Sequence, residues 1–285
     1  LRSACACVTA SLVFWKSTGA CEVCCCKVIC DCCKSSCAFV TSCRALASSI
    51  PASACPARTV SPAGVSPVRR NWLYAAADRK VATGPVSGWK VGARTPTAEP
   101  NPAPLLAGAL VRSPAAFDGK AMHMIGVEIE ISFHIVQDIA ARAAPVGRDE
   151  ALGAVGDAFV GMEVVDTRLA DFKSADPEWL LADNQMNHAL VIGDSIMDWK
   201  KLDWATLPVS LTIDGKVEVE QKGGLGAVDP VRPLAWMIDH AVRERGGIRA
   251  GQAITTGSWT GLRYYKPGTK ARGEFVGLGS VEASF

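Results

Sequence analysis

Two carboxylates separated by one residue, Glu128 and Glu130, lie in an otherwise apolar, β-branched stretch that reads Gly-Val-Glu-Ile-Glu-Ile-Ser-Phe. Alternate side chains of a β-strand share a face, so these carboxylates would repel each other unless a cation neutralises them. Glu163 lies in a similar apolar stretch and offers a third ligand. Carboxylates without cysteine or histidine neighbours favour Mg²⁺ or Mn²⁺ over Zn²⁺. The alternative is a strand with a solvent-facing acidic side.

Several other residues could bind or activate a substrate near such an ion. Lys90, in Gly-Trp-Lys-Val-Gly, could hold a substrate carboxylate or exchange a proton if its ammonium is partly desolvated. Otherwise it is a surface lysine after a tight turn. The amide of Asn184 could bind a substrate oxygen. Thr256, Gly257 and Ser258 offer hydroxyl and backbone N–H groups suited to a carboxylate, or simply form a turn capped by a hydroxyl.

Asp166 and Arg168 follow Glu163 closely in the sequence. They could form an ion pair behind the metal ligands that orients Glu163, or an ordinary salt bridge at the end of a strand. His188 and His240 have no partner at a metal-binding spacing, so both are expected to be structural.

These motifs occur in one order along the chain: Gly88-Trp89-Lys90-Val91-Gly92, Glu128-Ile129-Glu130, Glu163-Val164-Val165-Asp166-Thr167-Arg168, Ala182-Asp183-Asn184, Thr256-Gly257-Ser258 and Gly277-Leu278-Gly279-Ser280-Val281. The series extends over roughly residues 72–285 and is much more specific than any single motif in it. It resembles the fumarylacetoacetate hydrolase superfamily, and within it the branch of 2-oxopent-4-enoate hydratases and 4-oxalocrotonate decarboxylases.

The resemblance implies an α/β but β-rich fold, a mixed β-sandwich roll with flanking helices. It implies a homo-oligomer that acts on a small 2-oxo acid. A divalent ion held by three carboxylates would stabilise negative charge on the 2-oxo oxygen, and hydration, decarboxylation and C–C cleavage all exploit that charge. Lys90 is then a catalytic candidate, as is Lys173, which lies where the family has an Asp-Trp-Lys-like segment.

We therefore expect a metal-dependent lyase, with hydration of a 2-hydroxydienoic acid preferred over decarboxylation of a 2-oxo-3-enedioate. Two departures from the family pattern bear on this choice. Hydratases of the branch carry an acid after Gly-Trp-Lys-Val-Gly, whereas here Glu99 is the only carboxylate nearby. The hydrolases use an upstream histidine, and no histidine precedes His123, so hydrolysis is disfavoured. A contrasting hypothesis is a truncated, non-catalytic member that keeps only the metal site.

Charge and hydropathy narrow the possible partners. The chain has 285 residues with 30 basic and 28 acidic side chains, which gives no electrostatic reason to expect nucleic acid or an anionic membrane surface. No apolar run approaches the ~18 residues that span a bilayer. These features and the cysteine-free remainder of the chain favour a cytoplasmic enzyme.

The first quarter of the chain differs from the rest. All 12 cysteines lie between Cys5 and Cys55, among serine, alanine and proline. The gap between the Cys-x-x-Cys pairs is short for a zinc module, which weakens that hypothesis. A disulfide framework would need an oxidising compartment, whereas the rest of the chain resembles a cysteine-free cytosolic enzyme. We favour a third hypothesis, that residues 1–70 are disordered or are not a genuine coding segment, because their composition offers little with which to build a core and the chain begins with Leu. The catalytic domain would then be residues 71–285, beginning with the end of a helix over 71–84.

Periodicity predicts the elements that position the candidate residues. Strands are expected at 121–136, 162–165, 189–192 and 273–281, a hairpin over 209–220, helices over 148–159 and 230–245, and a lid-like loop over 95–104. The hairpin prediction rests on strict alternation around Asp214-Gly215. The first helix rests on Leu152, Val155 and Phe159 at helical spacing.

Overall fold

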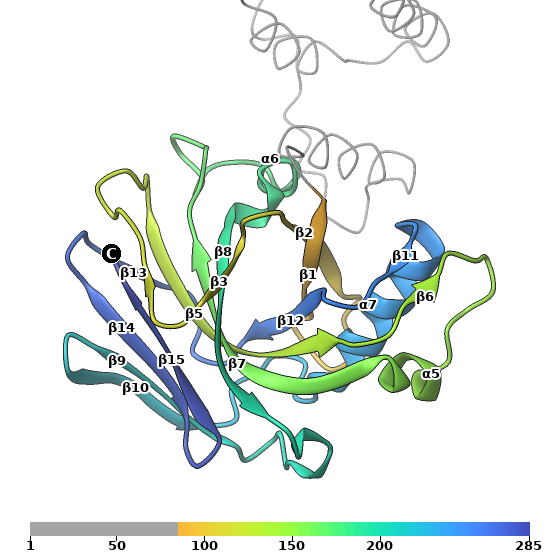
Figure 1. Cartoon of the computed structure of the whole chain (residues 1–285). Helices are drawn as coiled ribbons and strands as arrows, with labels where there is room; N and C mark the ends of the chain where they lie inside the picture. Colours follow the sequence, from red (N-terminus) through yellow and green to blue (C-terminus); the bar gives the residue numbers. More distant parts are fainter. Residues whose placement is uncertain (1–84) are drawn as a thin grey trace, which may run out of the picture. The chain divides into compact units, whose positions relative to one another are not determined.

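The computed structural model describes residues 85–285 of the chain (Figure 1). The expectations for residues 1–70, namely the zinc, disulfide and non-coding hypotheses, lie outside the described residues, as does the expected helix end over 71–84. None of the helices in the described part is long and apolar enough to cross a lipid bilayer.

Most of the regular structure consists of strands. In chain order they are β1 (Val86–Gly92), β2 (Asn101–Leu106), β3 (Leu110–Arg112), β4 (Ala115–Ala116), β5 (Ile125–Ile135), β6 (Ile139–Ala140), β7 (Val155–Val165), β8 (Asn187–Ile196), β9 (Pro208–Ile213), β10 (Lys216–Lys222), β11 (Gly247–Ile248), β12 (Ala253–Ser258), β13 (Arg263–Tyr265), β14 (Lys270–Phe275) and β15 (Gly279–Ser284). The helices are α5 (Arg148–Gly153), α6 (Pro177–Ala182) and α7 (Val231–Glu244), with 3₁₀ turns η3 (Asn184–Met186) and η4 (Trp199–Lys201).

The strands form two main sheets that pack against each other. The larger sheet has the order β2-β1-β12-β5-β7-β8-β3, with β13 paired to β5, and the smaller one has the order β10-β9-β14-β15-β4. Strand β1 runs parallel to β12 and antiparallel to β2, so the larger sheet is mixed. Strands β14 and β15 pack on β5, β7 and β8, while α7 packs on β1 and β12 (Figure 1). The expected β-rich α/β fold is confirmed.

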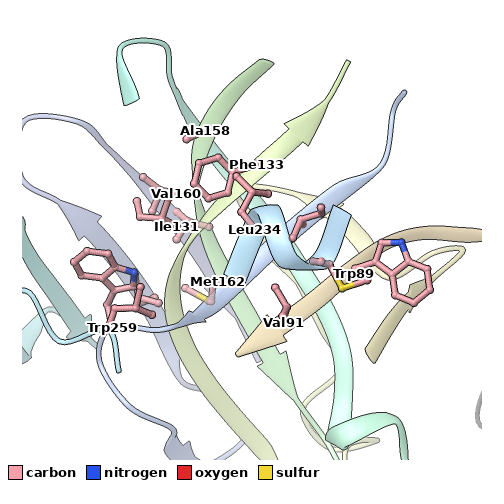
Figure 2. Close-up of a cluster of buried hydrophobic side chains, with 14 of the residues drawn as sticks. Trp89, Val91, Ile131, Phe133, Ala158, Val160, Met162, Leu234 and Trp259 are labelled. Carbon is pink, nitrogen blue, oxygen red and sulfur yellow. The ribbon is translucent and has the colours of Figure 1, made fainter. Parts of the chain in front are cut away.

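The long strand β5 separates an apolar face from a polar one. Its odd-numbered residues, such as Ile129, Ile131 and Phe133, are fully buried toward the smaller sheet and α7. Figure 2 shows part of this core, with Phe133 of β5 near Leu234 of α7. Its even-numbered residues face the other side and include the acidic pair. Burying each large apolar side chain contributes about 1.5–3 kcal/mol, which fixes the register and thereby the polar face.

Five predicted elements are confirmed with small changes in their bounds. The expected strand over 121–136 is the single strand β5, and the segments 162–165 and 189–192 lie inside β7 and β8. The hairpin turns at Asp214-Gly215, where both residues have positive φ. The helix expected over 230–245 is α7, which ends before Gly246 and Gly247, again both with positive φ.

Three other predictions were wrong in part. The helix expected over 148–159 ends at Gly153, and Phe159 lies in strand β7 because pairing of β7 with both β5 and β8 overrides a three-residue helical spacing. The loop expected over 95–104 contains the start of β2, whose prolines are tolerated because β2 is an edge strand. The strand expected over 273–281 is a hairpin, with β14 and β15 joined through Gly277 at positive φ.

Candidate metal and catalytic site

The three acidic residues predicted to bind a metal converge on the polar face of the larger sheet. Glu128 and Glu130 lie on β5, and Glu163 of β7 is directly opposite Glu128 in the antiparallel register. One carboxylate oxygen from each residue lies within 4.8 Å of the other two. Glu130 and Glu163 are buried, whereas Glu128 is partly exposed. The site therefore opens to solvent on the side of Glu128.

The crowding of these carboxyl groups raises two of their pKa values. Burial, and then the negative charge of Glu163, raise the pKa of Glu128 to about 7. The same two causes, with the charge of Glu128 added, raise the pKa of Glu130 to about 8. The pKa of a buried carboxyl group rises in this way when too little positive charge lies nearby to stabilise its ionised form. A further cation at this point would stabilise the ionised forms.

Lys90 of β1 reaches the same cluster. Its Nζ donates to Glu163 Oε1 at 2.5 Å and to the carbonyl oxygen of Gln185 at 3.3 Å. Only 14% of its side chain is exposed. Burial alone would lower the pKa of Lys90, but the charges of Glu163 and Glu128 outweigh it, so this pKa is raised and the side chain is an ammonium ion. The surface-lysine alternative is thus wrong for this position.

Three residues hold the carboxylates in place, and the sequence singled out only one of them, Gly257. The hydroxyl of Thr255 and the backbone N–H of Gly257 both donate to Glu130 Oε2, the latter at 2.9 Å. Gly257 has φ +108°, a conformation that glycine adopts readily, within an irregular pairing of β12 and β5. Asn187 donates from Nδ2 to Glu163 Oε1 at 3.0 Å. The Thr-Thr-Gly run was a usable sequence signal, but nothing in the sequence pointed to Asn187.

The predicted substrate-binding residues Thr256 and Ser258 are placed differently from each other. The hydroxyl of Thr256 donates to the backbone carbonyl of Ile131 at 2.8 Å, so it is not available to a ligand. The hydroxyl of Ser258 is buried beside Glu128. It offsets part of the rise in the pKa of that carboxyl, although the two groups do not form a hydrogen bond of good geometry. Ser258 and the Gly257 N–H therefore border the carboxylates, and Thr256 does not.

The predicted ion pair between Asp166 and Arg168 does not form. Arg168 instead pairs with the buried Asp183, with Nε 2.6 Å from Oδ1. Asp166 accepts backbone N–H groups, including that of Met124 at 2.8 Å. Neither residue contacts Glu163. Both residues lie beyond Val165, where β7 ends, so the two-residue repeat of a strand no longer places them on one face, and Asp183 lies against Arg168 instead.

Lys173 lies apart from the carboxylates, on an exposed loop between β7 and α6. Its Nζ is 5.9 Å from the centre of the Phe172 ring, and no hydrogen bond joins it to the acidic cluster in the described part of the chain. The ring centre of Phe172 lies 6.1 Å from that of Tyr264 on β13, and burial, followed by the charge of Glu128, raises the pKa of that tyrosine. The loop thus borders the open side of the site, and its lysine is not part of the cluster.

Glu99 is exposed in the loop before β2. The other three candidates have contacts that make them structural. The ring of His188 meets Phe117 edge-on. His240 stacks on Trp236 in α7, and burial lowers its pKa to about 4. Asn184 is buried and donates to the backbone carbonyl of Pro104 at 2.9 Å.

The donor set fits a hard divalent cation. Three carboxylates supply oxygen ligands, and no cysteine or histidine side chain in the described part of the chain joins them. Such a set suits Mg²⁺ or Mn²⁺. Glu128, Glu130 and Glu163 would hold the ion, while Thr255 and Asn187 would orient the ligands.

We expect Thr255→Val to weaken Mg²⁺ binding by about 10–100-fold, the usual effect of losing a partner of a metal ligand. The change keeps the shape of the side chain but removes the hydroxyl that donates to Glu130 and accepts from Ser132 at 2.8 Å. Isothermal titration with Mg²⁺ measures the change. Thr256→Val is the matched control, because it removes an adjacent buried hydroxyl that contacts only backbone, and equal losses in both variants would contradict the assigned role.

We also expect Mg²⁺ to raise the melting temperature, and to do so more at pH 8 than at pH 6. The raised pKa values mean that the folded, metal-free protein binds protons more tightly than the unfolded chain, so its unfolding free energy falls as pH rises toward 8. Metal binding needs the ionised carboxylates and therefore strengthens over the same range. Scanning fluorimetry with and without Mg²⁺ checks this, and a shift that is larger at pH 6 would contradict it.

The fold and site together define a β-rich protein with a three-carboxylate centre. Comparisons with known proteins show which proteins are similar to it. No protein-family model matches the chain. A 2-keto-4-pentenoate hydratase from Paraburkholderia phymatum is 29% identical over 183 residues, covering 62% of this chain and 69% of the relative. A 4-oxalocrotonate decarboxylase from a Pseudomonas species is 31% identical over 162 residues, covering 55% and 59%.

Among solved structures, the 4-oxalocrotonate decarboxylase of Pseudomonas putida G7, complexed with magnesium and adipate, aligns with a TM-score of 0.62 at 24% identity, covering 75% of this chain and 86% of that one. At this identity the alignment shows the fold. Together, the sequence relatives and the shared fold make the chain similar to the hydratases and decarboxylases of the fumarylacetoacetate hydrolase superfamily.

Proposed function

We propose that the chain is a divalent-metal-dependent hydro-lyase that adds water to a small 2-hydroxydienoic or 2-oxo acid such as 2-oxopent-4-enoate. The observation that carries the proposal is the convergence of three carboxylates beside a buried ammonium ion. The relative named 2-keto-4-pentenoate hydratase supports the reaction type. In this proposal residues 71–285 form the catalytic domain of a cytoplasmic homo-oligomer that acts in the breakdown of aromatic compounds.

The metal and the protein side chains have separate tasks in the proposed reaction. When bound, Mg²⁺ or Mn²⁺ would supply Lewis-acid stabilisation of negative charge on the 2-oxo oxygen. Lys90 supplies a positive charge at the edge of the cluster that attracts the substrate carboxylate, and its ammonium can hold a proton for transfer. The backbone N–H of Gly257 and the hydroxyl of Ser258 border the same space.

Burial of the cluster strengthens its electrostatic interactions with a substrate. Glu130 and Glu163 are almost inaccessible to solvent, so interactions with a substrate at the cluster act in a medium of low dielectric constant. Hydrogen bonds from Thr255 and Gly257 of β12 and from Asn187 of β8 hold the carboxylates before the substrate arrives, which is the arrangement that electrostatic catalysis requires. The open side at Glu128 is where a small acid can enter.

A decarboxylase acting on 4-oxalocrotonate or a related 2-oxo-3-enedioate is the second candidate. The Pseudomonas relative with that name, 31% identical over 162 residues, favours it. Both reactions need the same charge stabilisation on the 2-oxo oxygen, so the carboxylate cluster serves either one. The alternatives differ in the substrate tail, which carries a second carboxylate only in the decarboxylase reaction.

Turnover on two substrates separates the candidates. The full chain is incubated with Mg²⁺ and either 2-hydroxypenta-2,4-dienoate or 4-oxalocrotonate, and the products are identified. We expect loss of dienol absorbance with formation of the hydrated product. Release of CO₂ from the diacid alone would favour the decarboxylase. Turnover of neither substrate above the non-enzymatic rate would leave a protein that keeps only the metal site.

A further inference from the structure

The turn η3 has an unusual backbone. Asn184, Gln185 and Met186 have φ values of +56°, +51° and +60°, and none of them is glycine. Left-handed conformations at consecutive residues with side chains are strained, and they persist only where surrounding contacts enforce them. Such strain is concentrated at functional sites.

One side of the turn contacts the catalytic candidate Lys90. The backbone carbonyl of Gln185 accepts a hydrogen bond from Lys90 Nζ at 3.3 Å, in addition to the ion pair of Lys90 with Glu163. The left-handed conformation aims this carbonyl toward the cluster. Lys90 is thereby held between a carboxylate and a fixed carbonyl, and its position does not depend on the ion pair alone.

The other side of the turn is fastened to the edge strand β2. The side-chain amide of Gln185 donates to the carbonyl of Pro102 at 2.9 Å, and that of Asn184 donates to the carbonyl of Pro104 at 2.9 Å. These prolines flank Ala103, the residue directly opposite Lys90 in the pairing of β1 with β2. The turn is thus fixed to the backbone that faces Lys90.

The residue after the turn completes this arrangement. Asn187 donates to the same Glu163 oxygen that receives the Lys90 ammonium. One short segment therefore contacts both members of the Lys90–Glu163 pair. A turn with a purely structural role would not need to reach both.

We propose that the left-handed turn 184–186 is a positioning element that sets the place of Lys90, with the Gln185 side chain fastening the turn and the Gln185 carbonyl receiving the ammonium. The effect of this element on turnover rests on the proposed function. Its effect on the accessibility of Lys90 concerns the chain alone and holds whichever reaction is catalysed.

The test compares Gln185→Ala with Gln252→Ala in the full chain. Gln252 is a matched control, because its amide also donates to a backbone carbonyl of β1, that of Val86 at 2.9 Å, but it lies away from the acidic cluster. The accessibility of Lys90 is measured without metal by brief acetylation with acetic anhydride, followed by peptide mass spectrometry, with the exposed Lys216 as the internal reference. The kcat, KM and melting temperature are measured alongside.

We expect Gln185→Ala to raise Lys90 acetylation several-fold and to lower kcat by about tenfold with little change in KM, because small displacements of a reacting group are costly. Gln252→Ala should lower the melting temperature similarly but leave acetylation and kcat unchanged. Should Gln185→Ala not fold, Gln185→Gly gives the same comparison, since glycine adopts positive φ freely.

Unchanged Lys90 acetylation in a folded Gln185 variant would overturn the proposal. Equal changes in the Gln185 and Gln252 variants would also overturn it, because they would reflect general loosening. If the unaltered chain shows no turnover on either substrate, the proposed function fails while the acetylation result still decides the role of the turn.

Discussion

Replacement of Glu130 by alanine is expected to abolish turnover and to weaken Mg²⁺ binding by more than about 100-fold. This loss should exceed that of Thr255→Val, because Glu130 would bind the ion directly, whereas Thr255 only orients a ligand. Glu130 is buried, and Thr255 and Gly257 both donate to its carboxylate. Removing it leaves two carboxylates and two unsatisfied donors. Steady-state kinetics and titration calorimetry measure both effects.

Glu220→Ala supplies the control for this experiment. Glu220 is an exposed glutamate on β10, in the other sheet, so its loss changes the net charge equally without touching the site. Its Mg²⁺ affinity should equal that of the unaltered protein. A Glu130 variant that kept its turnover and its Mg²⁺ affinity would remove the basis of the proposed function.

Replacement of Lys90 by methionine is expected to lower the unfolding free energy of the metal-free protein by about 3 kcal/mol at pH 8, the usual result of removing one partner of a buried ion pair. The change retains an apolar chain of similar length but removes the positive charge beside Glu163. Mg²⁺ should recover part of the loss, because a bound cation replaces that charge. Turnover should stay very low even with Mg²⁺ in excess.

Urea unfolding with and without Mg²⁺ measures the stability change, and Lys216→Met provides the comparison. Lys216 is exposed at the hairpin, so its loss should change stability very little. Equal stability of the Lys90 variant and the unaltered protein at pH 8 would show that Lys90 does not neutralise the acidic cluster. Full turnover of the Lys90 variant would remove Lys90 from the proposed reaction.

The sequence by itself determined the features that depend on local periodicity. A spacing of two residues put Glu128 and Glu130 on one face of a strand, and strict alternation around Asp214-Gly215 predicted the hairpin. The apolar stripe of 230–245 predicted α7. Each of these follows from a repeat of 2 or 3.6 residues, which a single segment carries without reference to the rest of the chain.

Only the tertiary structure decided which distant residues meet at the site. It brought Asn187 to Glu163, Thr255 to Glu130 and the Gln185 carbonyl to Lys90. Arg168 forms its ion pair with Asp183, whereas the sequence suggested Asp166 as its partner. The segment around Phe159 is part of strand β7, whereas its spacing suggested a helix. The physical reason is that such contacts depend on strand pairing and on irregular backbone geometry, which join residues far apart in the chain and leave no periodic signal in the sequence.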